Sequence, residues 1–118
     1  MTNLPAGKEL DAAVLRILGW IRNYDEFTRD EYWTKTIFTF RGSLSDDDAE
    51  AMRLCGPWLD ERCWTWGVCR RHGVINGWAW SHGTWRGADG NYATRAMAIC
   101  NLVIAVAERE AERKEPTT

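Results

Sequence analysis

Apolar residues recur at helical spacing near the start of the chain, from Leu10 to Leu18, while charged residues take most of the positions between them. This period of about 3.6 residues predicts an amphipathic helix from about Lys8 to Leu18. Gly19 follows the last apolar position and is expected to end the helix. We expect Trp20 and Ile21 to fold back onto its apolar stripe.

The residues after this helix form two segments of different composition. Residues 23–31 are acidic and lack an apolar period, which predicts an irregular, exposed segment. Residues 33–41 are rich in β-branched and aromatic residues, and they predict one strand with Phe38 and Phe40 on one face and Ile37 on the other.

A second helix is predicted after the cluster Ser45–Asp48, in which a serine is followed three residues later by a carboxylate. This is the spacing of a capping box, and acidic residues are favoured at the positive end of a helix dipole. The helix would direct Ala49, Met52 and Cys55 inward and end at Gly56–Pro57. A metal site is the alternative interpretation, but consecutive carboxylates at a helix start do not converge on one ion.

The next segment is dominated by alternating tryptophans. Trp64 and Trp66 alternate with other residues, as do Trp78 and Trp80, and His72–Gly73 between them supplies a turn. The pattern predicts a β-hairpin.

A last helix is predicted to begin near residues 91–94, after a glycine-rich loop over residues 83–90. Its apolar positions fall on one stripe: Met97, Cys100, Ile104 and Ala107.

Together these elements predict an α+β fold in the order α-β-α-β-β-α. We expect a small layered α/β sandwich, with three helices and an antiparallel sheet of about three strands. A chain of 118 residues, 45% of them hydrophobic, suits one domain, expected over residues 1–110. Residues 111–118 mix charges of both signs and are expected to form a disordered tail.

Charge and composition narrow the class of partner. A net charge of -2 argues against a protein that coats long DNA or RNA, because such partners demand a strongly basic field. The start of the chain lacks the features of a signal peptide, and no apolar stretch is long enough to cross a bilayer. The four cysteines show no C-x-x-C spacing. We therefore expect a soluble cytoplasmic protein with reduced thiols and no membrane partner.

The strongest chemical signal is aromatic. Five of the eight tryptophans fall between Trp64 and Trp85, interleaved with glycines and arginines. Flat aromatic faces, guanidinium forks and helix N-terminal amides together suit a nucleotide-like anion. The expected ligand-binding residues are Trp80, Trp85 and Tyr92 for stacking, Arg86 and Arg95 for phosphate, and Asn91 and Thr94 at the start of the last helix.

Some of the tryptophans are expected to stabilise the fold and not to bind a ligand. We expect Trp64, Trp66 and Trp78 to belong to the core, because tryptophans alternating on strands of a small domain are more often buried than used as ligand platforms. Trp85, in the glycine-rich segment, fits a ligand platform and a subunit interface equally well.

No ordered set of nucleophile, base and orienting group is recognisable, so we expect no catalytic residues and no enzyme. A pair such as Cys69 with His82 lacks a visible oxyanion hole or carboxylate. The spacing of Cys63, Cys69 and His72 with His82 or Cys100 fits no structural zinc module, so we expect neither a metal nor another cofactor. Cys55 and Cys100 are expected to be small buried hydrophobic residues.

Three stretches of the chain resemble a known family. Residues 4–20 (LPAGKELDAAVLRILGW) and 93–102 (ATRAMAICNL) resemble the opening LPAG-x-ELDALVA-x-x-V-x-GW and closing A-I-C-x-A-x-L signatures of the small phage ABA-sandwich domain proteins. Residues 43–52 (SLSDDDAEAM) resemble that family's capped helix, YSTDIAAAW, without its tyrosine, and residues 22–41 form a longer insertion. The resemblance implies a phage or prophage origin and a compact layered α/β fold.

That family is in turn similar to the Thoeris anti-defence proteins, oligomeric viral sponges that bind a cyclic ADP-ribose isomer and, in some members, cyclic oligonucleotides. The resemblance implies a phage anti-defence protein that acts in immune evasion, sequestering a cyclic nucleotide without cleaving it, as a homo-oligomer in the host cytoplasm. The alternative is a phage accessory protein-interaction module that binds a protein through exposed tryptophans and has no small-molecule ligand. A hydrolase is the third hypothesis.

Overall fold

The computed structural model describes residues 6–63, 65–81 and 84–114. They form an α+β fold with three helices and two antiparallel three-stranded sheets. The helices are α1 (Lys8–Ile17), α2 (Asp48–Arg62) and α3 (Arg95–Lys114). The first sheet comprises β1 (Ile21–Asp25), β2 (Asp30–Lys35) and β3 (Phe38–Phe40), and the second comprises β4 (Thr65–Arg71), β5 (Val74–Ser81) and β6 (Thr84–Tyr92).

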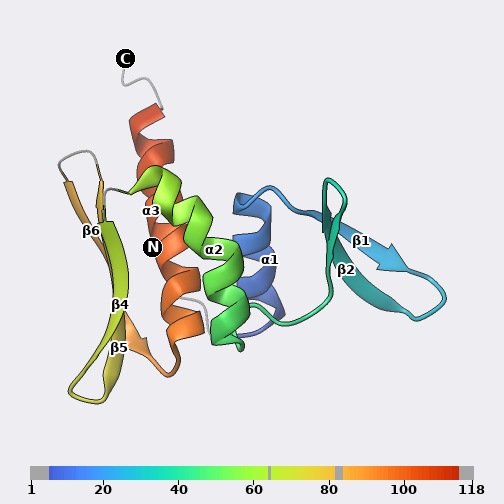
Figure 1. Cartoon of the computed structure of the whole chain (residues 1–118), viewed down its shortest axis with the longest axis horizontal. Coiled ribbons are helices and arrows are strands. Elements are labelled where there is room, and N and C mark those ends of the chain that lie inside the picture. Colours follow the sequence, from blue (N-terminus) through green and yellow to red (C-terminus); the bar gives the residue numbers. More distant parts are fainter. Residues whose placement is uncertain (1–5, 64, 82–83, 115–118) are drawn as a thin grey trace.

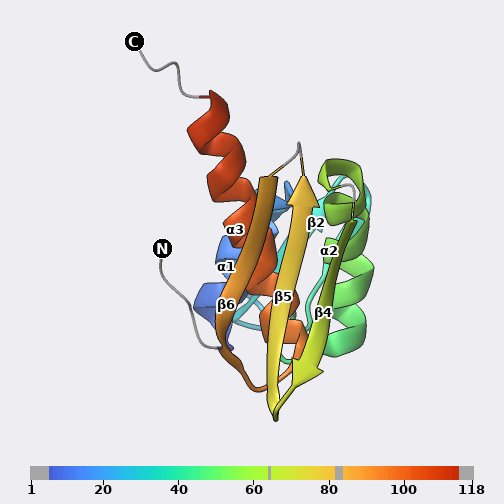
Figure 2. The same ribbon diagram turned by 90° about the vertical axis from the view of Figure 1, so that its left-hand side faces the viewer.

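Helix α3 lies at the centre of the molecule. It contacts α1, α2 and the second sheet, and Figures 1 and 2 show the helices gathered on one face of that sheet. Because other elements surround α3, it buries residues on more of its surface than the single apolar stripe that the sequence predicted. Ala96, Ile99 and Val103 are almost fully buried together with Cys100, whereas Met97 and Ile104 are half-buried.

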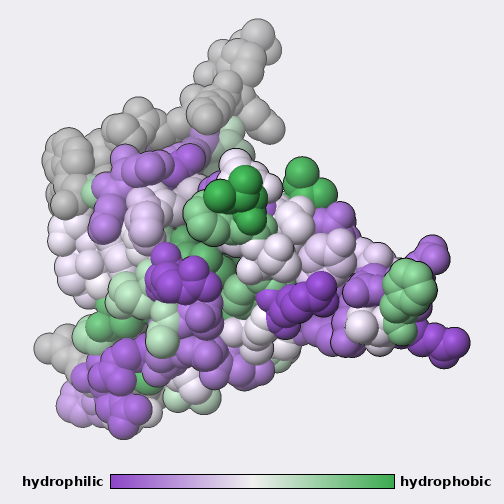
Figure 3. Space-filling model, turned by 45° about the vertical axis from the view of Figure 1, so that its right-hand side comes forward, coloured by the Kyte–Doolittle hydropathy of each residue, from purple (hydrophilic) through white to green (hydrophobic). Residues whose placement is uncertain are grey.

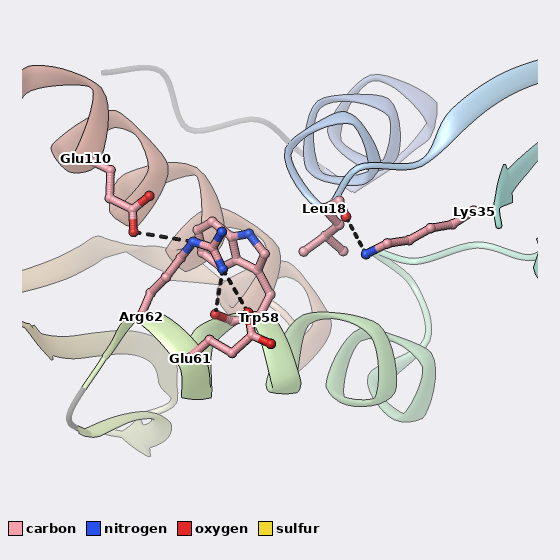
Figure 4. Close-up of polar contacts among 6 residues, drawn as sticks. All are labelled: Leu18, Lys35, Trp58, Glu61, Arg62 and Glu110. Atoms are coloured by element: carbon pink, nitrogen blue, oxygen red, sulfur yellow. Dashed lines mark hydrogen bonds and ion pairs between the residues drawn. The ribbon is translucent and has the colours of Figure 1, made fainter. Parts of the chain in front are cut away.

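The first sheet projects from this body as an arm, which we define as residues 21–40 (Figure 1). Only its base is buried: Trp20, Trp33 and Phe40 pack into the main core. The Nζ of Lys35 donates a 2.7 Å hydrogen bond to the carbonyl oxygen of Leu18, which fixes the arm to the end of α1 (Figure 4).

Three expectations for this region are wrong. Residues 23–31 are not irregular but pair as the β1–β2 hairpin, and the strand expected over residues 33–41 is two strands separated by a turn at Thr36, whose φ is +54°. Ile21 is 66% exposed rather than folded onto α1. The arm escaped the sequence pattern because a hairpin that projects into solvent needs no alternation of apolar and polar residues.

Helix α2 begins later and ends later than expected. Its N-cap is Asp47, whose carboxylate accepts a 3.1 Å hydrogen bond from the Glu50 amide, and the helix continues past Gly56–Pro57 to Arg62. A residue before proline is normally kept out of helical conformation by a clash with its Cβ, which glycine lacks. The side chains that α2 buries are Ala51, Cys55 and Leu59, whereas Ala49 and Met52, which were expected to point inward, are exposed.

The end of α2 is held to α3 by Arg62. Its guanidinium lies 4.3 Å from the Trp58 ring centroid and 3.3 Å from the Glu110 carboxylate, with Glu61 at 3.4 Å (Figure 4). The burial of Leu59 and this contact offset the helix hydrogen bond that Pro57 removes.

The hairpin expected in the second half is confirmed as β4–β5. His72 and Gly73 both have positive φ, +52° and +80°, as a two-residue type I′ turn requires. Most of the predicted loop over residues 83–90 belongs instead to strand β6, and residues 82–83 lie outside the described part.

The last helix also runs further than expected. It continues to Lys114, so residues 111–114 are helical rather than part of a disordered tail, and residues 115–118 lie outside the described part. None of the helices in the described ranges combines the length and apolar character needed to cross a membrane.

Candidate functional site

The structure separates the expected ligand-binding residues into two groups. In the backbone register Trp80 is opposite Trp85, and Arg86 is opposite Ala79, at one end of β6. Tyr92 is opposite Ile75 at the other end. Seven residues of strand span roughly 20 Å, so the two groups do not line one small pocket within a single chain.

At the start of α3, acceptors of the chain itself already bind two of the backbone amides that could hold an anion. The Asp48 carboxylate accepts a 2.8 Å hydrogen bond from the amide of Ala96, and the Thr94 hydroxyl accepts one of 3.2 Å from the amide of Met97. The helix N-terminus is thus already capped by the chain's own acceptors, and Asp48 adds a negative charge there.

The individual residues of this group agree with that conclusion. Tyr92 is only 5% exposed and belongs to the core, so its ring offers no stacking face in the isolated chain. Arg95 is exposed, and Thr94 acts as a cap. The geometry therefore does not support the stacking role expected for Tyr92 or the free amides expected near Thr94. The side chain of Asn91 lies outside the described residues.

At the other end of β6 the side chains of Trp80, Trp85 and Arg86 also lie outside the described residues. The best-defined aromatic group nearby is Trp78, which sequence reasoning assigned to the core. Ile75, Gly77 and Ala79 of β5 are buried toward α3, so Trp78 lies on the opposite face of the sheet, where it is half-buried.

Trp78 lies across a glycine. Gly67 on β4 and Gly87 on β6 are its two cross-strand partners, and a Cβ added to Gly67 would lie only 2.9 Å from Cζ2 of the indole. Glycine is required at Gly67 because the ring occupies the space that a side chain would take. Thr65 and Cys69 on β4 are exposed on the same face.

We call Thr65, Gly67, Cys69 and Trp78 the outer sheet face. Within the described part of the chain no helix or strand covers it, as Figure 2 shows. Trp80 lies two residues beyond Trp78, so the register continues this face toward the Trp80–Trp85 pair. The sequence contained a signal for the outer sheet face. Gly77 and Ala79 are small enough to leave room for a helix on one face of β5, and the alternating positions of Trp78 and Trp80 then belong to the other face.

Trp66, also expected in the core, is half-buried against α2. Its Nε1 donates a 2.7 Å hydrogen bond to Asp60, and its ring lies near Gly56. Trp64 lies outside the described residues. Trp66 therefore connects β4 to α2 rather than serving a ligand.

The motifs that carry the family resemblance meet in space. Backbone amides of Leu44 and Ser45 donate to the Asp11 carboxylate at 3.2 and 2.7 Å, and the Ser45 hydroxyl accepts from the amide of Gly7 at 2.8 Å. Ser45 is fully buried and is not the helix cap. These residues hold the start of α1 to the segment before α2, which is a structural role.

Three of the four cysteines are buried. Cys55, Cys63 and Cys100 are buried, Cys69 is exposed, and none forms a disulfide. A hydrogen bond with Cys55, together with burial, raises the pKa of Cys100 far above its ordinary 9.0, which keeps this thiol neutral. His82, the suggested partner of Cys69, lies outside the described residues. Within the described ranges, no three His, Cys, Asp or Glu side chains gather as a metal site would need.

Comparison of the chain with protein-family models, with curated proteins and with solved structures finds no match. The resemblance to the phage ABA-sandwich proteins therefore stays a prediction from the sequence motifs.

Proposed function

We propose that the chain is a non-catalytic binding protein that captures a cyclic nucleotide on the outer sheet face. The observation that supports this proposal is the Trp78 indole lying across Gly67 on an uncovered sheet, in register with the Trp80–Trp85 pair. An antiparallel sheet with tryptophans on its open face suits a planar base, since each base–aromatic stack contributes about 1–3 kcal/mol. Arg86 is opposite Ala79 in the register, in the row of positions that alternates with that of Trp78 and Trp80, so the phosphate role expected for it is not part of this proposal.

The proposed mechanism is stoichiometric capture. Slow release, rather than turnover, would keep an immune messenger from its effector, so the protein must accumulate to the messenger's concentration. The family resemblance supports this role for a phage or prophage protein in the cytoplasm of its bacterial host. We further propose that it acts as a homo-oligomer.

A thermal-shift panel tests the proposal. Cyclic ADP-ribose isomers and cyclic oligonucleotides are added to the purified chain and to its Trp78→Ala and Gly67→Ala variants. At least one ligand should raise the melting temperature of the parent. Both variants should lose most of that shift, because one removes the ring and the other displaces it.

Arg95→Ala is the matched control, because Arg95 is exposed at the start of α3, beyond the end of β6 that lies far from Trp85, and its removal should leave ligand binding unchanged. Heating the washed complex should then release intact nucleotide, whereas a cleaved product would indicate a hydrolase. No shift with any ligand, or equal shifts in the parent and Trp78→Ala, would overturn the proposal.

A protein partner on the same face is the second candidate. The exposed positions Thr65 and Cys69 lie two residues either side of Gly67 and extend the open surface beside Trp78 along β4. This candidate expects no nucleotide-induced shift. It also expects Trp78→Ala and Trp85→Ala to abolish a pull-down from host extract while the isolated domain remains folded.

A further inference from the structure

The tip of the arm presents a large apolar side chain to solvent. Phe27, between β1 and β2, is 100% exposed. Figure 3 shows the arm extending from the body with largely hydrophilic side chains and a hydrophobic one near its end. The tip is also ordered, because the Asp25 carboxylate accepts hydrogen bonds from the amides of Phe27 and Thr28 at 2.9 and 3.4 Å. A fixed, solvated phenyl ring at the end of an arm is typical of a side chain that is buried on association.

A groove at the base of the arm is lined mainly by charged side chains, and the guanidinium groups and aliphatic stems of such side chains can pack against an aromatic ring. It measures about 300 Å³ and is lined by α1 and the start of β1; we call it the α1 groove. Its lining residues are Lys8, Glu9, Ala12, Arg16 and Arg22. A second cleft of about 290 Å³ shares Lys8 and Arg22 and adds the buried Leu15 and Trp33.

The charges of the tip and the groove are complementary. Among the described residues, Lys8 and Arg16 have no carboxylate partner and Glu9 has no cationic one, while Arg22 is paired with Glu31 at 3.0 Å. The groove therefore presents two unpaired cations and one unpaired anion. The tip presents the reverse balance, with Asp25, Glu26 and Asp30 as anions and Arg29 as a cation.

The topology brings these two surfaces together in a pair of chains. β1 is an edge strand of the arm, so its outer edge carries unpaired backbone groups. The strand begins at the base of the arm and ends at its tip. Two copies of β1 paired antiparallel would therefore place each tip at the base of the other arm. Pairing centred on Asn23 sets Arg22 opposite Tyr24 and Ile21 opposite Asp25 of the second copy, with no like charges facing each other.

We propose that the arm is a self-association element, in which the β1 edges of two copies pair and Phe27 of each enters the α1 groove of the other. The contact is the same on both chains, so it closes at a dimer instead of propagating. The occupant is a second copy because both complementary surfaces belong to the same chain. This inference does not depend on nucleotide capture, since the outer sheet face lies elsewhere.

Sedimentation analysis over a concentration series tests this inference. The parent should be dimeric, and Phe27→Ala should raise the dimer dissociation constant at least tenfold. Phe27 has no contacts to lose in the monomer, so near-ultraviolet circular dichroism should be unchanged. Ile37→Ala is the matched control, because Ile37 is 90% exposed at the opposite turn of the arm and should leave the dimer intact.

A charge exchange sharpens the test. Glu26→Arg and Arg16→Glu should each weaken the dimer, and the double variant should recover most of the loss. A parent that is monomeric at every concentration, or a dimer unaffected by Phe27→Ala, would overturn the inference. A Phe27-dependent dimer without any charge recovery would also overturn the assignment of the α1 groove.

Discussion

At the scale of single residues, Asp48 occupies the position at which an anionic ligand was expected. It belongs to the first turn of α2 but accepts a hydrogen bond from Ala96 at the start of α3. We predict that Asp48→Ala lowers the free energy of unfolding by about 1 kcal/mol, since capping acceptors contribute this much. Urea denaturation measures the difference.

Asp46→Ala provides the comparison for that prediction. Asp46 is exposed, and the side-chain bond recorded for it is a long one, 3.4 Å, from Ser43. Its removal should change the free energy of unfolding by less than about 0.5 kcal/mol. If the two variants were equally stable, the Asp48–Ala96 bond would contribute nothing, and the start of α3 would again be open to a ligand.

At the scale of elements, α2 and α3 meet at two buried thiols, and this contact makes stability depend on pH. The hydrogen bond with Cys55 and burial raise the pKa of Cys100 above 9.0 in the folded chain. Above pH 9 the unfolded chain releases this proton while the folded chain retains it. The contribution of Cys100 to the free energy of unfolding should therefore be constant below pH 8 and fall above pH 9, by at most about 1.4 kcal/mol per pH unit.

Cys100→Ala isolates this effect from other groups that titrate in alkali. The variant should be less stable at neutral pH by about 1 kcal/mol, because it leaves a small cavity. Its stability should then decline less steeply between pH 8.5 and 9.5 than that of the parent. Parallel pH profiles for the two proteins would show that Cys100 is not responsible.

The elements also show what the sequence could predict. The three helices were predicted because each buries an apolar face on a body that surrounds it. Strand β6 was not, because Gly87, Ala88 and Gly90 have low strand propensity; its conformation depends on pairing with β5 and packing on α3. The helix end predicted at Gly56–Pro57 was wrong. Proline disfavours a continuing helix, but Gly56 before it and the buried Leu59 after it override that preference.

At the scale of the whole molecule, the candidate site was only partly accessible from the sequence. The tryptophan-rich strands were recognised, but the face on which each ring lies depends on the position of α3, which covers Ala79 and leaves Trp78 outside. Trp85 and Tyr92 lie far apart because residues 84–92 form the extended strand β6 and not the loop that was expected. Of the arm, only one strand over residues 33–41 was predicted, and the β1–β2 hairpin was missed because its outer half follows no burial pattern.

The arm has a buried base and a solvated outer half, and we predict that changes in these two parts affect stability differently. Replacing residues 24–31 with an Asn-Gly turn would join Asn23 to Tyr32, which are already opposite each other in the register, and should keep the body folded. Trp33→Ala should instead cost about 3–5 kcal/mol, because Trp33 is 8% exposed and packs in the core. Urea unfolding at a concentration where the chain is monomeric distinguishes the two. A shortened chain that lost cooperative unfolding would mean that the outer half of the arm stabilises the body, and Phe27 would then not be exposed for association alone.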